Sequence, residues 1–247
     1  RLQLKRIARN NRFIQVIALY LLLWCGLQLM QTVSLIYLEQ VMKVPTQISK
    51  WIGPIPFQLS ALIGLQVWSI HSNRYGRISA LYWGGGIWIA ACVVAIFLPP
   101  LSDGASIGSL LALSGNDPLK LLGLITIILM VGFGASTAYL IPWSLLPDAI
   151  DADPDKPAGL YTAWMVLIQK IGIGLSVQIL GILLSFAGYR STNDCAGSLA
   201  CMEQPTTAQF TIRLCMGLIP ATLVTIGLLL MRRWPDKRAH LQSTAAA

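Results

Sequence analysis

The chain has 247 residues, of which 55% are hydrophobic and only 11% carry a charge. Soluble domains carry about 25% charged residues, so this composition excludes an ordinary water-soluble protein and indicates a polytopic membrane protein. The net charge of +8 does not indicate a nucleic-acid partner, because the usual nucleic-acid-binding modules need a water-soluble fold.

Six apolar stretches are long enough to cross the hydrocarbon core of a bilayer, which takes about 20 residues of helix. They cover residues 13–38, 51–72, 78–98, 119–145, 159–186 and 210–231. Their apolar residues are continuous rather than alternating, which predicts helices and not β-barrel strands. We therefore expect an all-α protein with a six-helix transmembrane domain over 13–231, preceded by segment 1–12 and followed by tail 232–247.

Lysine and arginine are distributed unevenly over the two sides that six spans define. The side that holds both termini has twelve of them. They are Arg1, Lys5, Arg6, Arg9, Arg12, Arg74, Arg77, Lys156, Arg232, Arg233, Lys237 and Arg238. The opposite connections hold four, namely Lys43, Lys50, Lys120 and Arg190. Because cytoplasmic loops carry the excess of positive charge, we expect both termini in the cytoplasm and the chain in the plasma (inner) membrane.

A stripe of aromatic and amide side chains runs along the first predicted helix. Tyr20, Trp24, Gln28 and Gln31 recur at helical spacing. Rings offer flat apolar faces and amides offer both donors and acceptors, so the stripe suits a polar organic ligand. The alternative is ordinary packing or interfacial placement of the two aromatic residues.

The fifth predicted helix contains a lysine far from either end. Lys170 is about 16 Å along the helix, close to the middle of the membrane. A charge at that depth costs at least about 2.5–3.5 kcal/mol, so it normally faces a cavity or a partner. Gln169 adjoins it, and Gln178 follows eight residues later. The alternative, a lysine that snorkels to the interface, requires a longer side chain than lysine has.

Four aspartates lie close together between the fourth and fifth predicted helices: Asp148, Asp151, Asp153 and Asp155. The last three stand at positions 1, 3 and 5 of a calcium-binding EF-hand loop. Positions 6 and 12, which require Gly and Glu, are Lys156 and Thr162, so the motif fails. Prolines and a glycine in the same segment favour turns, and we expect a loop that is either a hydrated connector or a gate.

The longest connection on the side opposite the termini contains Cys195 and Cys201. In an oxidising compartment these two residues can form a disulfide, and the alternative is two unpaired thiols. Cys25, Cys92 and Cys215 lie within predicted spans and are interpreted as packing residues.

Two pairs of small residues, Gly132 with Ser136 and Gly172 with Ser176, have the spacing that permits close contact between membrane helices.

The segment that begins at Pro142 and Trp143 and ends at Asp153 resembles the P-W-x-x-L-P-D-x-x-D-x-D signature of the glycoside–pentoside–hexuronide:cation symporters. This branch of the major facilitator superfamily includes melibiose carriers and lysophospholipid symporters. The family has a lysine in the following helix, which Lys170 matches. The segment from His71 to Arg77 resembles the superfamily's D-R-x-G-R loop, with Asn73 in place of the Asp.

The resemblance implies that the six spans are helices 7–12, the carboxyl-terminal half of a twelve-helix transporter, and that the chain is a fragment whose partner is the missing amino-terminal half. It implies coupled transport of a sugar or related polar solute with Na⁺ or H⁺, whose main site is expected in the missing half. No other cofactor and no enzymatic activity are expected. Sodium-coupled lysophospholipid transport is the alternative, and an intramembrane metal-dependent enzyme or an inactive half-transporter is a lesser one.

The resemblance and the residue patterns together define two sets of candidate residues. Substrate binding or coupling is assigned to Lys170, Gln169, Gln178, Tyr20, Trp24, Gln28 and Gln31. Cytoplasmic gate contacts are assigned to Asp148, Asp151, Arg74 and Arg77. Because Asn73 replaces the Asp of the family's loop, an ion pair at that loop is expected to be weaker.

Overall fold

The computed structural model describes residues 10–101, 117–155, 157–190 and 204–234. Within these ranges the chain is helical and contains no strand. The α-helices are α2 (Asn11–Ile36), α3 (Thr46–Ile52), α4 (Pro54–Tyr75), α5 (Arg77–Phe97), α7 (Asp117–Asp151), α8 (Ala158–Phe186), α9 (Thr206–Met216) and α10 (Leu218–Leu230). A π-helical turn, η1 (Tyr37–Val41), extends α2, and a 3₁₀ turn, η4 (Met231–Arg233), follows α10.

Five segments of the described chain are long and apolar enough to cross a membrane. They are Asn11–Val41, Arg77–Phe97, Asp117–Ile150, Ala158–Phe186 and Thr206–Arg233. The remaining predicted span, 51–72, is present as α4, whose 22 residues are long enough but whose mean hydropathy is lower. Polar side chains such as Gln58, Gln66 and His71 along α4 account for this difference.

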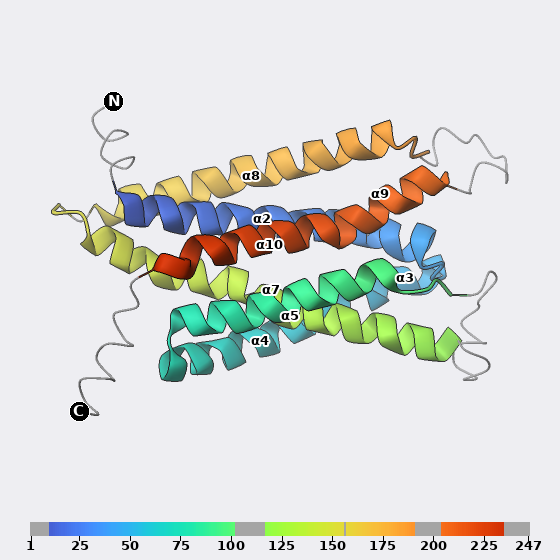
Figure 1. Cartoon of the computed structure of the whole chain (residues 1–247), viewed down its shortest axis with the longest axis horizontal. Helices are drawn as coiled ribbons and strands as arrows, with labels where there is room; N and C mark the ends of the chain where they lie inside the picture. Colours follow the sequence, from blue (N-terminus) through green and yellow to red (C-terminus); the bar gives the residue numbers. More distant parts are fainter. Residues whose placement is uncertain (1–9, 102–116, 156, 191–203, 235–247) are drawn as a thin grey trace.

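The helices pack lengthwise in two layers (Figure 1). In the first layer α2 lies between α8 and α7, and α7 lies between α2 and α4. In the second layer α10 packs on α2 and α5, and α5 packs on α7. The long central helices α2 and α7 are therefore covered on more sides than α8, which packs mainly on α2.

One end of the bundle, which we call the proximal end, holds the start of α2, the end of α10, the α4–α5 turn and the α7–α8 connection (Figure 1). The opposite, distal end holds η1, α3 and the C-terminus of α5. An even number of passes through the bundle brings the chain back to the end from which α2 starts.

Two of the predicted spans are interrupted by glycine. The span predicted over 51–72 contains Gly53, which separates α3 from α4, and the span predicted over 210–231 contains Gly217, which separates α9 from α10. A β-carbon at position 217 would lie 2.7 Å from the carbonyl oxygen of Cys92, so glycine permits the close approach of this break to α5.

The small-residue pairs do mark close helix contacts, as predicted. A β-carbon at Gly132 would lie 2.4 Å from the carbonyl oxygen of Phe57, so the backbones of α4 and α7 nearly touch there. A β-carbon at Gly172 would lie 2.4 Å from Cδ1 of Leu21, which places α8 directly on α2. Close backbone approach of this kind increases van der Waals contact where lipid supplies no hydrophobic driving force.

The distal end of α5 is capped by side chains from two other elements. Tyr37 donates its hydroxyl to the carbonyl of Ala95 at 2.6 Å. Arg213 on α9 donates to the carbonyls of Ile96 at 2.8 Å and Leu98 at 3.0 Å. The last carbonyls of a helix lack donors within the helix and carry partial negative charge, so a cation there stabilises the end of α5.

Candidate functional site

Four aromatic rings form a cluster between α2 and α7. Tyr20 and Trp24 are one turn apart on α2, and Tyr139 and Trp143 are one turn apart on α7. Ring centroids are 5.9 Å apart for Tyr20–Trp24, 5.8 Å for Tyr20–Trp143 and 5.4 Å for Trp24–Tyr139. All three pairs are edge-to-face, an arrangement that aromatic quadrupoles favour.

The exposure of these rings divides the cluster into a base and a surface. Tyr20 is 1% exposed and lies at the base, whereas Trp143 is 37% exposed. The indole nitrogen of Trp24 is buried and has no hydrogen-bond partner within the described part of the chain. Trp143 and the half-buried Trp24 and Tyr139 are therefore better placed to meet a ligand than Tyr20 is.

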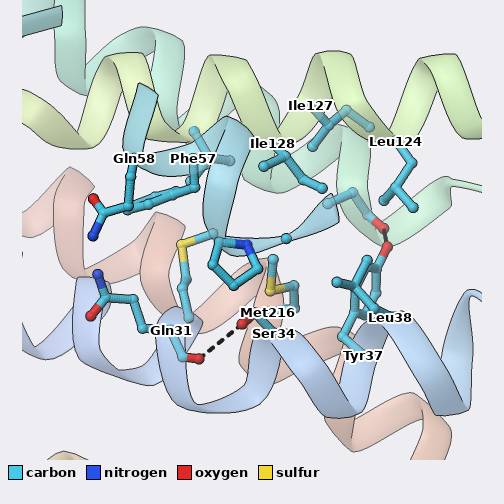
Figure 2. Close-up of a pocket in the computed structure, with 15 residues that line it drawn as sticks. Gln31, Ser34, Tyr37, Leu38, Phe57, Gln58, Leu124, Ile127, Ile128 and Met216 are labelled. Carbon is cyan, nitrogen blue, oxygen red and sulfur yellow. Dashed lines mark hydrogen bonds between the residues drawn. The ribbon is translucent and has the colours of Figure 1, made fainter. Parts of the chain in front are cut away.

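The two glutamines of the α2 stripe have different surroundings. Gln28 is half-buried, and its amide donates to the hydroxyl of Thr32 at 3.3 Å. Gln31 is exposed and lines a cavity. The amides of Gln31 on α2 and Gln58 on α4 both point toward the same side of this cavity (Figure 2).

The cavity has a volume of about 270 Å³ and lies between α2, α4, α5, α7 and α9. Its lining is mostly apolar, and the polar groups are concentrated on α2 and α4. The lining residues are Met30, Gln31, Ser34, Tyr37, Leu38, Gly53, Pro54, Phe57, Gln58, Ala95, Leu124, Ile127, Ile128, Val131 and Met216. Sequence reasoning identified only Gln31 among them, although the lower hydropathy of the α4 stretch was a signal for Gln58.

Lys170 lies on α8, two residues before the midpoint of that 29-residue helix, and its side chain is exposed. The thiol of Cys25 lies 3.7 Å from the carbonyl oxygen of Gly172, so Lys170 is at nearly the same depth as Trp24. In the described part of the chain Lys170 has no hydrogen bond or ion pair. Of its predicted companions, Gln178 is exposed and Gln169 is half-buried.

The segment that carries the first two aspartates is helical, which corrects the prediction of a loop. α7 continues through Pro142 and Pro147 as far as Asp151, instead of ending at residue 145. Its 35 residues span about 52 Å, so the helix is longer than the thickness of a hydrocarbon core, about 30 Å. The prediction of a loop therefore relied too heavily on the turn-forming residues and did not take the packing of α7 into account.

Arg77 contacts α7 beside Pro147. Proline at 147 removes the donor that would bind the carbonyl of Trp143. Arg77, the first residue of α5, donates to the next carbonyl, that of Ser144, and forms an ion pair with Asp148. The Arg77 and Asp148 side chains are 11% and 20% exposed. Two predicted gate residues thus contact each other within this half of the bundle.

The other two predicted gate residues, Arg74 and Asp151, are exposed at the proximal end. The predicted loop around Arg74 is a single residue, Gly76, because α4 ends at Tyr75 and α5 starts at Arg77. Gly76 has a φ of 94°, which residues with a side chain rarely adopt.

A second proximal contact was missed by sequence reasoning. Asn10 donates to the carbonyl of Ala149 at 2.8 Å and to the hydroxyl of Tyr161 at 3.1 Å, and Tyr161 donates to Asp153 at 2.9 Å. Asp153 and Tyr161 are buried. The signal in the sequence was Asn10 itself, since an asparagine directly before an apolar run is typical of a helix N-cap.

Cys195 and Cys201 lie outside the described residues. Within the described ranges, no three His, Cys, Asp or Glu side chains are grouped so that they could hold a metal ion.

The sequence profile of a family described as MFS/sugar transport protein matches residues 1–237. The chain belongs to this family. The family places the chain among the major facilitator transporters, and together with the apolar helices it makes the chain an integral membrane protein.

Proteins named as symporters or transporters resemble the chain over 42–96% of its length. It is 30% identical over 241 residues to an uncharacterized symporter of Synechocystis sp., a match that covers 96% of this chain and 40% of that protein. It is 26% identical over 199 residues to human sodium-dependent lysophosphatidylcholine symporter 1, covering 78% of this chain and 32% of that protein. A sphingosine-1-phosphate transporter of Xenopus tropicalis is 27% identical over 110 residues, covering 42% of this chain and 20% of that protein. The chain thus spans about two fifths of the length of the first relative.

Proposed function

We propose that the chain is the carboxyl-terminal half of a cation-coupled secondary transporter that works by alternating access. Its family, and the symporters that it matches over about two fifths of their length or less, support this proposal. The amino-terminal half would be its partner and would hold the main Na⁺ or H⁺ site. In this proposal the proximal end faces the cytoplasm and the protein lies in the plasma (inner) membrane.

The observation that carries the proposal is the exposed Lys170 near the midpoint of an apolar 29-residue helix. A lysine that faces lipid at that depth costs about 2.5–3.5 kcal/mol, so this side of α8 would face a water-filled cavity or the partner half. Cys25, next to Trp24, is in contact with Gly172, two residues after Lys170. Lys170 and the α2–α7 aromatic cluster are therefore at about the same level along the bundle. A substrate bound against the aromatic cluster would therefore be level with the charge.

The first candidate substrate is a sugar or a related polar solute. Trp143, Trp24 and Tyr139 would provide ring faces for the apolar side of such a molecule, and the exposed Gln31 would provide a donor and an acceptor. Lys170 would orient the substrate or couple the cation site to it.

The second candidate is a lysophospholipid, and the apolar cavity specifically favours it. A cavity of about 270 Å³ with polar groups on one side suits an apolar chain whose polar end stays outside. The names of two relatives, a lysophosphatidylcholine symporter and a sphingosine-1-phosphate transporter, agree with a lipid substrate. Lys170 could then meet a phosphate.

Cation-dependent uptake by the full-length protein tests the role of Lys170. Lys170→Ala should lower uptake by about tenfold or more, because a charge-assisted contact to substrate contributes roughly 1.5–3 kcal/mol. Lys50→Ala, which removes an exposed lysine on α3 at the distal end, is the matched control and should transport normally. Undiminished coupled uptake by Lys170→Ala, at equal membrane expression, would refute the proposed role.

Competition of uptake by a panel of glycosides and lysolipids distinguishes the two substrate classes. Ile128→Phe places a larger side chain in the cavity wall, whereas Ile226→Phe enlarges a side chain that is 52% exposed on α10. If the substrate is a lysolipid, only the first substitution should weaken its competition. Competition by glycosides that neither substitution alters would support the sugar class.

A further inference from the structure

α8 is much less covered by the rest of the bundle than the other membrane-crossing segments. Only 17% of its membrane-crossing window is buried, compared with 44–56% for the other four segments. Because α8 packs mainly on α2, its position depends on a small number of contacts. Lys170 belongs to this helix, so whatever fixes α8 also fixes the mid-membrane charge.

The contacts near the middle of α8 are weakly directional. Gly172 and Ser176 are buried against α2, and the hydroxyl of Ser176 binds the carbonyl of Gly172 within α8 itself. Between the two helices, the side chain of Leu21 lies over Gly172, and the thiol of Cys25 lies 3.7 Å from the carbonyl oxygen of Gly172. Small residues and a thiol permit close packing, but they define rotation and sliding less strongly than short hydrogen bonds do.

The proximal end of α8 is fixed by shorter hydrogen bonds among Asn10, Asp153 and Tyr161, which we call the proximal cluster. The Tyr161 hydroxyl donates to Asp153 Oδ2 at 2.9 Å and accepts from Asn10 Nδ2 at 3.1 Å. The same Asn10 nitrogen donates to the carbonyl of Ala149 on α7 at 2.8 Å. The cluster therefore joins the N-cap of α2, the end of α7 and the first turn of α8.

Burial strengthens this cluster. Tyr161 is 0% exposed and Asp153 is 5% exposed, so water competes little for their hydrogen bonds. The second carboxylate oxygen of Asp153 accepts the backbone N–H of Asp155 at 3.1 Å, which fixes the turn before α8. The Tyr161 ring also packs edge-to-face on Phe13 with centroids 4.6 Å apart, independently of the hydroxyl.

We propose that Asn10, Asp153 and Tyr161 are positioning residues that set the placement of α8 and, through it, of Lys170. Tyr161 and Lys170 are nine residues apart on one continuous helix, a distance of about 13.5 Å along its axis. A shift at the proximal end is therefore transmitted to Lys170 by the rigid helix. The consequence for transport rests on the proposed function of Lys170, whereas the placement of α8 does not.

Thiol reactivity of an engineered cysteine on α8 tests the placement directly. In a full-length protein whose native cysteines have been replaced, Gly174→Cys reports on α8 one turn beyond Lys170. Gly86→Cys on α5 is the matched control, since a β-carbon at either glycine meets no atom within 4 Å. Tyr161→Phe removes the hydroxyl and keeps the ring, and Asp153→Asn replaces the acceptor for that hydroxyl.

Both substitutions should change the rate of reaction with a charged methanethiosulfonate at position 174 by about fivefold, which is the factor by which one net hydrogen bond shifts a local equilibrium. The rate at position 86 should stay unchanged. An unchanged rate at 174, or equal changes at 174 and 86, would overturn the proposal. If Asp153→Asn does not fold, Tyr161→Phe decides alone because it preserves the packing on Phe13.

Uptake kinetics separate this proposal from the function of Lys170. Tyr161→Phe should raise the KM for uptake, and in a Lys170→Ala background it should raise the KM no further. A KM increase of equal size in both backgrounds would show a general structural effect and contradict the positioning role. If Tyr161→Phe changes the thiol reactivity at position 174 but leaves uptake unchanged, the proposed positioning of α8 is supported and the proposed function of Lys170 is refuted.

Discussion

α7 and α8 are consecutive helices of similar mean hydropathy, 2.1 and 1.8, yet they have opposite relations to the bundle. α7 is packed between α2, α4 and α5, and 56% of its membrane-crossing window is buried, whereas the value for α8 is 17%. The polar groups of α7 are engaged, as in the ion pair of Asp148 with Arg77. On α8 the charge of Lys170 is exposed. The difference indicates that α7 mainly stabilises this half, while α8 presents a polar group to whatever faces it.

The largest expected effect on stability is at the contact between α7 and α4. Gly132→Ala places a β-carbon 2.4 Å from the carbonyl oxygen of Phe57, and we expect a loss of about 3 kcal/mol from overpacking. Gly174→Ala on α8 meets no atom within 4 Å and should change stability by less than about 1 kcal/mol. Thermal unfolding of the two purified variants in detergent measures both changes in stability. Equal destabilisation by Gly132→Ala and Gly174→Ala would contradict the proposed difference between α7 and α8.

A smaller effect is expected from the ion pair at the proximal end of α7. Asp148→Asn or Arg77→Gln should each cost about 2 kcal/mol, below the usual cost of breaking a fully buried pair because both side chains are partly exposed. The double variant Arg77→Gln with Asp148→Asn should lose less than the sum of the single variants. Thermal unfolding of all four proteins completes this cycle, and strict additivity would mean that the pair does not contribute as a unit.

The smallest effect on stability is expected for Lys170 itself. Lys170→Ala should change the free energy of unfolding by less than about 0.5 kcal/mol, since the side chain is exposed. The same variant is expected to lower coupled uptake by about tenfold or more, so stability and function would separate on α8. A lowered melting temperature comparable with that of Gly132→Ala would show that Lys170 is structural instead.

Much of the fold followed from local properties of the sequence. Apolar length predicted the helices, and the spacing of Gly132 with Ser136 and of Gly172 with Ser176 predicted two close helix contacts. Helical periodicity placed Tyr20 and Trp24 on one face, and the predicted span placed Lys170 near its middle. These features depend on residues that are close in sequence, because backbone hydrogen bonds within a membrane helix join residues four apart.

Other features were decided by contacts between distant parts of the chain. Pro147 and its neighbours predicted a turn, yet α7 is helical to Asp151, where it packs on α4 and α5 and binds Arg77 through Ser144 and Asp148. The tertiary structure also buried Tyr20, exposed Trp143, and joined Asn10 to Tyr161 across 151 positions.

The sequence by itself therefore determined where the long apolar helices lie, where small residues allow helices to touch, and where along its helix Lys170 lies. Only the tertiary structure decided which polar groups are engaged and which remain available. The reason is physical: span length and periodicity are properties of one helix, whereas the burial of a carboxylate or the partner of an arginine depends on how several helices pack.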